Sequence, residues 1–403
     1  MKKKNLFTAL LVAGTLLCAG CEKLDDKIEN FPDYDEQRVP ASVSLNELAE
    51  LFAEVPFGTQ QMEEVYQAVL ASADNGYDEE YTLRDLFISP GAGVGEDKLE
   101  TKSPVKSYDT PLRDLLAQTV RARAARTKAD GGEPLDADAY LQALQESDAQ
   151  IYWPYFENWE GDVLPVITFD PGDNSSNNIG YRLVGEGEDR HVETVTVTEE
   201  MAMETPVWVI NRNDDAAYTT LQVLRKNDPD WGQGGTVTVR SAGTDADTRT
   251  LFLREFKMLR NFDCWFAGAS EFFIKAGALE DFRASTEAEL RLYNPAITDF
   301  MLVCRRRWRG QVIQVNTVLV SQWTDQLDKI AFMVIEDDGG SMTSWKCNAV
   351  VKYNSKSYGI ELELPFRRYD DIVWRGQLSN YYLSKYNNQR SRFGDVEISF
   401  SLE

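Results

Sequence analysis

Ile151-Tyr152-Trp153-Pro154 stands at the point where the spacing of apolar residues along the chain changes. Before it, apolar residues recur three or four positions apart, which is the period of one helix face. After it, apolar and polar residues mostly alternate, which is the period of a strand with one face in water. The sequence therefore predicts an α+β protein, with short helices first and mainly antiparallel β-structure after them.

The helical region is predicted to span residues 44–150. Ser44 is placed to cap the first helix, with Glu47 three residues further on as its capping-box partner. The apolar stripes of these helices are narrow, which favours a small helical layer packed on another element. The helices are predicted at residues 45–52, 59–71, 81–87, 112–126 and 136–144.

Two β domains are predicted after this region, a β-rich domain at residues 151–230 and an antiparallel β-sandwich at residues 231–403. The boundary falls at residues 226–235, which are rich in Asp and Gly and typical of a loop. Short strands follow one another without helical segments between them, as in a sandwich. Those of the sandwich are predicted at residues 236–240, 250–257, 265–275, 288–292, 300–305, 312–320, 330–336, 349–353, 358–364, 372–376 and 396–402.

The composition excludes several classes of function. The 403 residues carry a formal net charge of -24, and so acidic a surface repels phosphate backbones, so no nucleic-acid partner is expected. A single histidine, His191, excludes zinc sites and acid–base schemes built from several histidines. The 43% hydrophobic content is enough to fill folded cores.

Catalytic motifs are scarce in the sequence. No G-x-S-x-G occurs, and His191 begins an alternating segment, which predicts an exposed strand residue. Carboxylate pairs stay open, because the 66 acidic residues offer many. A glycan hydrolase needs two carboxylates beside an aromatic cleft, and residues 157–162 combine acids with a tryptophan. A non-catalytic surface binding or structural module is the favoured interpretation, and a carboxylate-dependent glycan hydrolase is the alternative.

Aromatic residues supply the candidate contacts to a glycan or protein ligand. Trp and Tyr stack on sugar rings and also fill β-sandwich cores, so both interpretations stay open. One group lies near the predicted domain junction, and the other lies in an asparagine-rich segment where full burial is not expected. The candidates are Tyr152, Trp153, Tyr155 and Trp159 in the first group and Trp374, Tyr381 and Tyr382 in the second.

Loop acids supply the candidate metal ligands. Asp170 and Asp173 lie in one predicted loop, and Asp228 and Asp230 lie in another. Carboxylate oxygens are ligands that calcium prefers, although neither loop has the spacing of an EF-hand. No cofactor is expected apart from calcium at these loops.

The first 21 residues resemble a bacterial lipoprotein signal. A positive start is followed by an apolar segment, residues 6–17, that is too short to span a bilayer. Ala19 and Gly20 then provide small side chains before Cys21. The resemblance implies that residues 1–20 are a signal peptide and that Cys21 is lipidated, for example with palmitate, which anchors the chain to the membrane. An ordinary secretory signal, cut elsewhere, is the alternative.

Residues 21–43 are predicted to form an acidic tether. Its first part, residues 22–26, resembles the acidic export signal of surface lipoproteins in the Bacteroidetes, and a solvated acidic linker is the alternative. Further on, the segments at residues 152–155, 164–167 and 206–209 make the chain similar to uncharacterised secreted lipoproteins of that phylum. The resemblance implies attachment to the outer membrane, with exposure on the cell surface as the further expectation. It implies no activity.

Cys264, Cys304 and Cys347 remain in the predicted β-sandwich. Three cysteines form at most one disulfide within the chain. The apolar neighbours of Cys264 and Cys304 favour free thiols that pack as small hydrophobic side chains.

Overall fold

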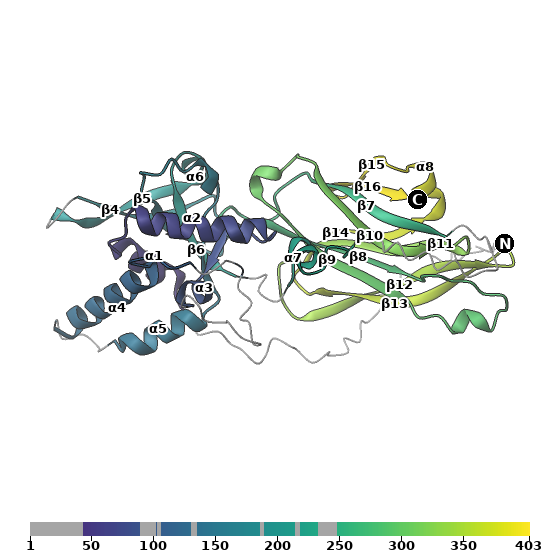
Figure 1. Ribbon diagram of the computed structural model, residues 1–403, viewed down its shortest axis with the longest axis horizontal. Coiled ribbons are helices and arrows are strands. Elements are labelled where there is room, and N and C mark those ends of the chain that lie inside the picture. The colour runs from purple at the N-terminus through teal and green to yellow at the C-terminus, as the bar shows by residue number, and fades with distance from the viewer. Residues whose placement is uncertain are drawn as a thin grey trace, which may run out of the picture. The chain divides into compact units, whose positions relative to one another are not determined.

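The computed structural model describes residues 43–88, 102, 106–129, 135–185, 189–213, 218–232 and 248–403. The predicted signal peptide, Cys21, almost all of the acidic tether and the strand predicted at residues 236–240 lie outside the described residues. The fold is α+β, as predicted, with helices and one sheet from the first half of the chain and two sheets from the second half (Figure 1).

The N-terminal helices are α1 (Leu45–Glu54), α2 (Thr59–Asp74), α3 (Leu83–Phe87), α4 (Leu112–Ala129) and α5 (Ala137–Glu146). The predicted cap is confirmed, since the Ser44 hydroxyl accepts the N–H of Glu47 at 3.3 Å. The third helix is shorter than predicted, because residues 80–82 form a strand and Thr82 caps α3 by accepting the N–H of Asp85 at 3.1 Å.

The first sheet has six strands in the order β1-β2-β6-β3-β4-β5, all antiparallel except the β3–β6 pair. Leu48 and Phe52 of α1 pack in one core cluster with Trp153 and Trp208, so the helices and this sheet bury a common core. The strands are β1 (Glu80–Thr82), β2 (Ala149–Tyr152), β3 (Val166–Phe169), β4 (Asn177–Val184), β5 (His191–Thr198) and β6 (Val207–Arg212).

The second half of the chain forms a β-sandwich of two antiparallel sheets that share one large core cluster. One sheet has the order β10-β7-β16-β15, and the other has the order β13-β12-β11-β8-β9, with β14 also paired to β11. Residues 330–336 of β11 are all buried, as expected of a strand covered on both faces. The strands are β7 (Arg249–Met258), β8 (Ser270–Ala278), β9 (Ala296–Cys304), β10 (Ile313–Trp323), β11 (Leu327–Glu336), β12 (Met342–Tyr353), β13 (Lys356–Arg367), β14 (Asp371–Ser379), β15 (Arg390–Phe393) and β16 (Val396–Leu402).

Two predicted strands differ from the structure. Residues 288–292 are not a strand but contain a 3-10 turn, because Glu289 accepts the N–H of Ser285 at 2.7 Å and holds the chain in a turn. The strand predicted at residues 265–275 begins only at Ser270, since Trp265 and Phe266 are buried in a loop. Short helices that the sequence analysis missed are α6 (Glu199–Glu204), α7 (Leu221–Asn227) and α8 (Asn380–Lys385).

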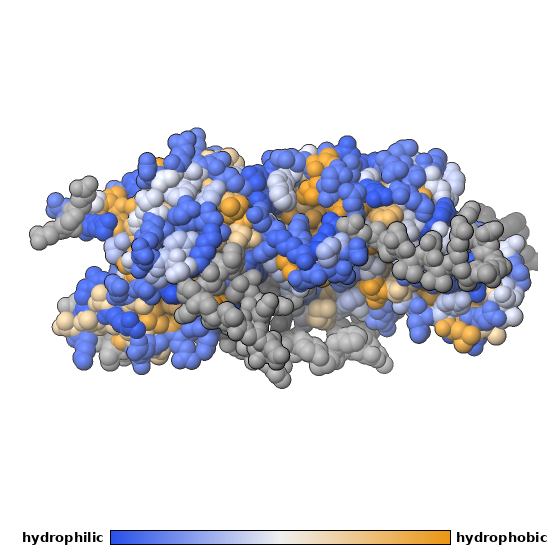
Figure 2. Space-filling model, viewed as in Figure 1, coloured by the Kyte–Doolittle hydropathy of each residue, from blue (hydrophilic) through white to orange (hydrophobic). Residues whose placement is uncertain are grey.

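The surface is mainly hydrophilic and the cysteines are free thiols, as the sequence analysis expects. On the face shown in Figure 2 hydrophilic residues predominate, and apolar residues form small separate patches. Cys264, Cys304 and Cys347 are free thiols, and the latter two are buried. Within the described ranges, no helix combines the length and the apolar character that crossing a membrane requires.

Candidate metal centre

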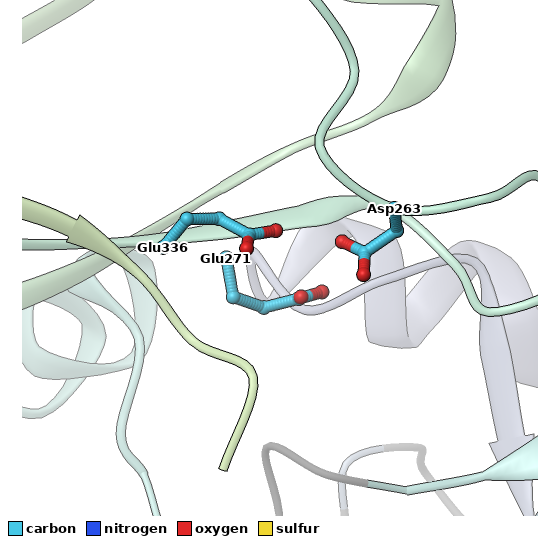
Figure 3. Close-up of side chains that lie close together, drawn as sticks. All are labelled: Asp263, Glu271 and Glu336. Carbon is cyan, nitrogen blue, oxygen red and sulfur yellow. The ribbon is translucent and has the colours of Figure 1, made fainter. Parts of the chain in front are cut away.

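Three carboxylates meet at one end of the second sheet of the sandwich. Asp263 lies in the segment between β7 and β8, Glu271 is the second residue of β8, and Glu336 is the last residue of β11. One side-chain oxygen from each lies within 4.8 Å of those of the other two. Figure 3 shows the three side chains directed toward one another.

Strand pairing brings Glu271 and Glu336 together. β8 and β11 are antiparallel neighbours with Glu336 opposite Phe272, and just beyond this pair the N–H of Asp337 donates to the carbonyl of Glu271 at 2.9 Å. Asp263 joins them because the N–H of Phe262 donates to the hydroxyl of Ser270 at 3.0 Å and folds the preceding segment back over the start of β8. The pairing of β8 with β11 and the bond to the Ser270 hydroxyl therefore bring the three carboxylates together.

Glu336 is the most unusual member of the triad. Its side chain is buried, with 1% of the residue exposed, and no N–H donor among the described residues reaches either of its carboxylate oxygens. Oδ2 of Asp263 likewise has no N–H donor, and the two carboxyl groups are hydrogen-bonded to each other. A buried carboxylate without a donor is costly, because neither water nor protein offsets the lost hydration of the charge.

The pKa values of Glu336 and Asp263 describe the protonation of the triad in the absence of a cation. Burial first, and then the neighbouring Asp263 carboxyl, raise the pKa of Glu336 to about 12. Burial is also the main reason that the pKa of Asp263 rises to about 6. Glu336 therefore holds a proton at neutral pH when nothing else neutralises the triad.

Further acids surround the triad. Asp338 and Asp371 raise the pKa of Glu336, and Asp170 raises that of Asp263. Arg260 pairs with Asp371 and Asp395, at 3.4 and 2.9 Å.

Arg306 contacts the backbone of Asp263 and also acts on its carboxyl group. Its Nη1 donates to the carbonyl oxygen of Asp263 at 2.9 Å, while its Nε donates to Glu199 at 2.8 Å. The positive charge of Arg306 partly offsets the effect of burial on the pKa of Asp263. The arrangement concentrates negative charge in a partly enclosed space, and it can hold a metal ion.

Of the loop acids that the sequence analysis proposed as ligands, only Asp170 is electrostatically coupled to the triad, through Asp263. The others form local turns in which a carboxylate accepts a nearby N–H. Asp173 accepts that of Ser175 at 3.0 Å, and Asp228 accepts that of Asp230 at 3.1 Å. The sequence does contain a signal for the triad, namely Glu336 at the end of an unbroken apolar run, where a solvated acid is not expected.

The first aromatic group is mostly core. Tyr152 and Trp153 are buried, at 0% and 1% exposure. Trp159 is half-buried and lies 5.7 Å from Trp153 between ring centroids. Tyr155 is half-buried, and its hydroxyl donates to Glu199 at 2.8 Å. These four aromatic residues lie near one another because their side chains pack in, or against, the hydrophobic core.

The second aromatic group divides into two kinds of residue. Trp374 and Tyr382 are half-buried, and both rings meet Phe393 edge-on, at 5.0 and 6.2 Å between centroids. Tyr381 is 73% exposed, with Lys385 5.6 Å above its ring. Only Tyr381 of these three therefore presents most of its ring to solvent.

Glu157, in the acidic segment at residues 157–162, is bound by arginines. It pairs with Arg305 at 3.2 Å and with Arg307 at 2.5 Å. His191 is exposed at the start of β5, as predicted, and its Nδ1 lies 2.9 Å from the carbonyl of Asp189. Comparisons with protein-family models, curated proteins and solved structures give no match for the chain.

Proposed function

We propose that the protein is a lipid-anchored cell-envelope protein of the outer membrane whose β-sandwich is a non-catalytic binding module that holds one calcium ion. The anchor rests on Cys21 and the residues around it, which resemble a lipoprotein signal. The acidic tether that follows supports exposure on the cell surface. The cation rests on the triad of Asp263, Glu271 and Glu336.

The main support for a bound cation is the buried environment of the Glu336 carboxylate. Both of its carboxylate oxygens are buried without an N–H donor among the described residues, and the hydrogen bond that its side chain does make is to another carboxyl group, that of Asp263. A bound divalent cation supplies what these oxygens lack, because it neutralises the charge and replaces the missing donors.

The donor set favours a hard cation. Oxygen ligands alone suit calcium, magnesium and manganese, whereas zinc and copper favour nitrogen and sulfur ligands. Calcium binds oxygens at about 2.3–2.6 Å and tolerates irregular geometry. Two oxygens bound to the same calcium ion are thus at most about 5 Å apart, and the 4.8 Å span of the triad fits this limit. Water is able to complete the shell, and the charges of Asp338 and Asp371 add to the negative potential at Glu336.

Isothermal titration calorimetry of the chelator-treated protein with calcium chloride tests the proposal. We expect one site per chain, and Glu336→Gln should weaken it at least tenfold, because the amide removes a charged ligand while it keeps the shape of the side chain. Glu361→Gln, at an exposed position of β13, is the matched control and should bind as the wild type does. The absence of a calcium signal in the wild type, or equal affinity of Glu336→Gln, would overturn the proposal.

A ligand surface on the same module is supported by Tyr381. Its ring is 73% exposed on α8, near the half-buried Tyr382 and the exposed Tyr386. Exposed tyrosine provides amphipathic contact area at a low cost in side-chain entropy, which suits a glycan or a protein partner. Loss of binding to envelope glycans on an array by Tyr381→Ala, with wild-type folding, supports such a ligand, whereas unchanged binding contradicts this role of Tyr381.

A further inference from the structure

The segment at residues 264–269, here called the docking loop, joins the sandwich to the first sheet through hydrogen bonds. Nε1 of Trp265 donates to the carbonyl of Ser176 at 3.0 Å. Nδ2 of Asn211, in β6, donates to the carbonyl of Phe266 at 3.2 Å. The N–H of Ala269 donates to Asp78 at 3.0 Å. Each bond connects residues that are far apart in the sequence.

Packing strengthens this contact. Trp265 and Phe266 are buried, at 3% and 0% exposure, in a cluster with Tyr152, Val166 and Val209 of the first sheet. The rings of Trp265 and Phe266 also lie 3.9 Å apart between centroids. Burial of two large aromatic side chains makes the docking loop a principal apolar contact between the first sheet and the sandwich.

The backbone of the docking loop approaches the first sheet closely at Gly268. A Cβ atom there would lie 2.8 Å from Oδ2 of Asp78, and the φ angle of +143° disfavours other residues. The contact therefore depends on the backbone path of the docking loop. An interaction that holds the two ends of the loop in place also stabilises its contact with the first sheet.

Two of the three proposed calcium ligands bracket the docking loop. Asp263 immediately precedes it, and Glu271 follows it by two positions. Glu336 belongs to β11, which is paired on both sides by β8 and β14 and is therefore a rigid support. An ion bound to all three carboxylates ties both ends of the loop to that central strand.

We infer that calcium at the Asp263–Glu271–Glu336 triad acts as a brace that holds the docking loop in place and so stabilises the contact between the β-sandwich and the first sheet. This inference rests on the proposed calcium site. Without the ion, the link from the two ends of the loop to β11 through a common cation is lost. The segment at Asp263 is also held by the bond from Arg306 to the carbonyl of Asp263 and by the bond from the N–H of Phe262 to Ser270.

Cys264 is a natural reporter of the loop, because it is the first residue of the docking loop and is half-buried, whereas Cys304 and Cys347 are buried. A short pulse of iodoacetamide on the full chain, with peptide-resolved mass spectrometry, measures the labelling rate of Cys264 alone. Hydrogen exchange of the amides at residues 265–269 measures the remainder of the loop.

We expect saturating calcium to slow the labelling of Cys264 and the exchange of these amides at least fivefold relative to chelator. Glu336→Gln should lose this dependence, while Glu361→Gln should keep it. If calorimetry detects calcium but both rates are unchanged, the brace is overturned and the calcium site stands. If calorimetry detects no calcium binding, the proposed site is itself wrong, and the brace fails with it.

Discussion

The carboxyl group of Glu336 is hydrogen-bonded to that of Asp263 at the end of the central strand of the sandwich, and no N–H donor among the described residues reaches either oxygen of Glu336. One residue is held by the pairing of β11, and the other is held by a loop that contacts the first sheet. Asp263 and Glu336 therefore lie between the interior of the sandwich and the contact of the docking loop with the first sheet. The proposed calcium site requires that these two carboxyl groups face each other.

Calcium should stabilise the folded protein. A ligand that binds only the native state at one hundred times its Kd adds about 2.7 kcal/mol to the free energy of unfolding. We expect the midpoint of thermal unfolding to rise with calcium in the wild type and in Glu361→Gln, but not in Glu336→Gln. In chelator, Glu336→Gln should unfold within about 1 kcal/mol of the wild type, because the amide replaces a protonated acid of similar shape. A calcium shift of equal size in Glu336→Gln would contradict the assignment.

Glu64 should make stability depend on pH independently of the metal centre. Burial raises its pKa from 4.5 to about 7, although Oε2 accepts the N–H of Leu112 at 2.7 Å. The folded state thus binds the proton more tightly than the unfolded state does. This contribution to stability is complete below pH 4.5 and is lost as the pH rises through 7.

The variant Glu64→Gln isolates this effect. Relative to the wild type, it should gain up to about 3 kcal/mol in the free energy of unfolding between pH 4.5 and pH 8, because the amide cannot ionise. Urea unfolding at the two pH values measures the gain, and Glu361→Gln is the control. A difference between variant and wild type that is the same at both pH values would show that Glu64 does not titrate as described.

The two tyrosines at the start of α8 should respond differently to truncation. Tyr381→Ala should change the free energy of unfolding by less than about 0.5 kcal/mol, because its ring is 73% exposed. Tyr382→Ala should cost about 1–3 kcal/mol, less than a fully buried aromatic, because its half-buried ring contacts Phe393 and Tyr386. Thermal or urea unfolding of the two single variants provides the comparison. Equal losses would show that Tyr381 is part of the packing and would remove it as a ligand contact.

Lipidation at Cys21 is tested in cells. Metabolic labelling with a palmitate analogue should mark the wild type, and Cys21→Ser should lose the label and keep its signal peptide uncleaved at that position. Cys18→Ser is the matched control, because this cysteine lies three residues earlier in the same segment and should not affect labelling. Equal label on the wild type and on Cys21→Ser would refute the anchor.

Periodicity predicted the sandwich well, because short-range alternation is sufficient to identify strands such as β7 and β16. It did not distinguish a buried strand from a buried loop at Trp265 and Phe266, since both bury the same apolar side chains. Nor could it find the triad. Glu336 meets Glu271 through the pairing of β11 with β8 and meets Asp263 through a fold-back of the chain, and both are long-range features that no local pattern specifies.

The most direct test is a crystal structure of the full chain grown with calcium. The account predicts one strong anomalous peak bonded to one oxygen each of Asp263, Glu271 and Glu336 at about 2.3–2.6 Å, with the docking loop ordered against the first sheet. The contrary result is a calcium-saturated crystal without a peak there, in which Glu336 and Asp263 share a proton in a short hydrogen bond of about 2.5–2.7 Å.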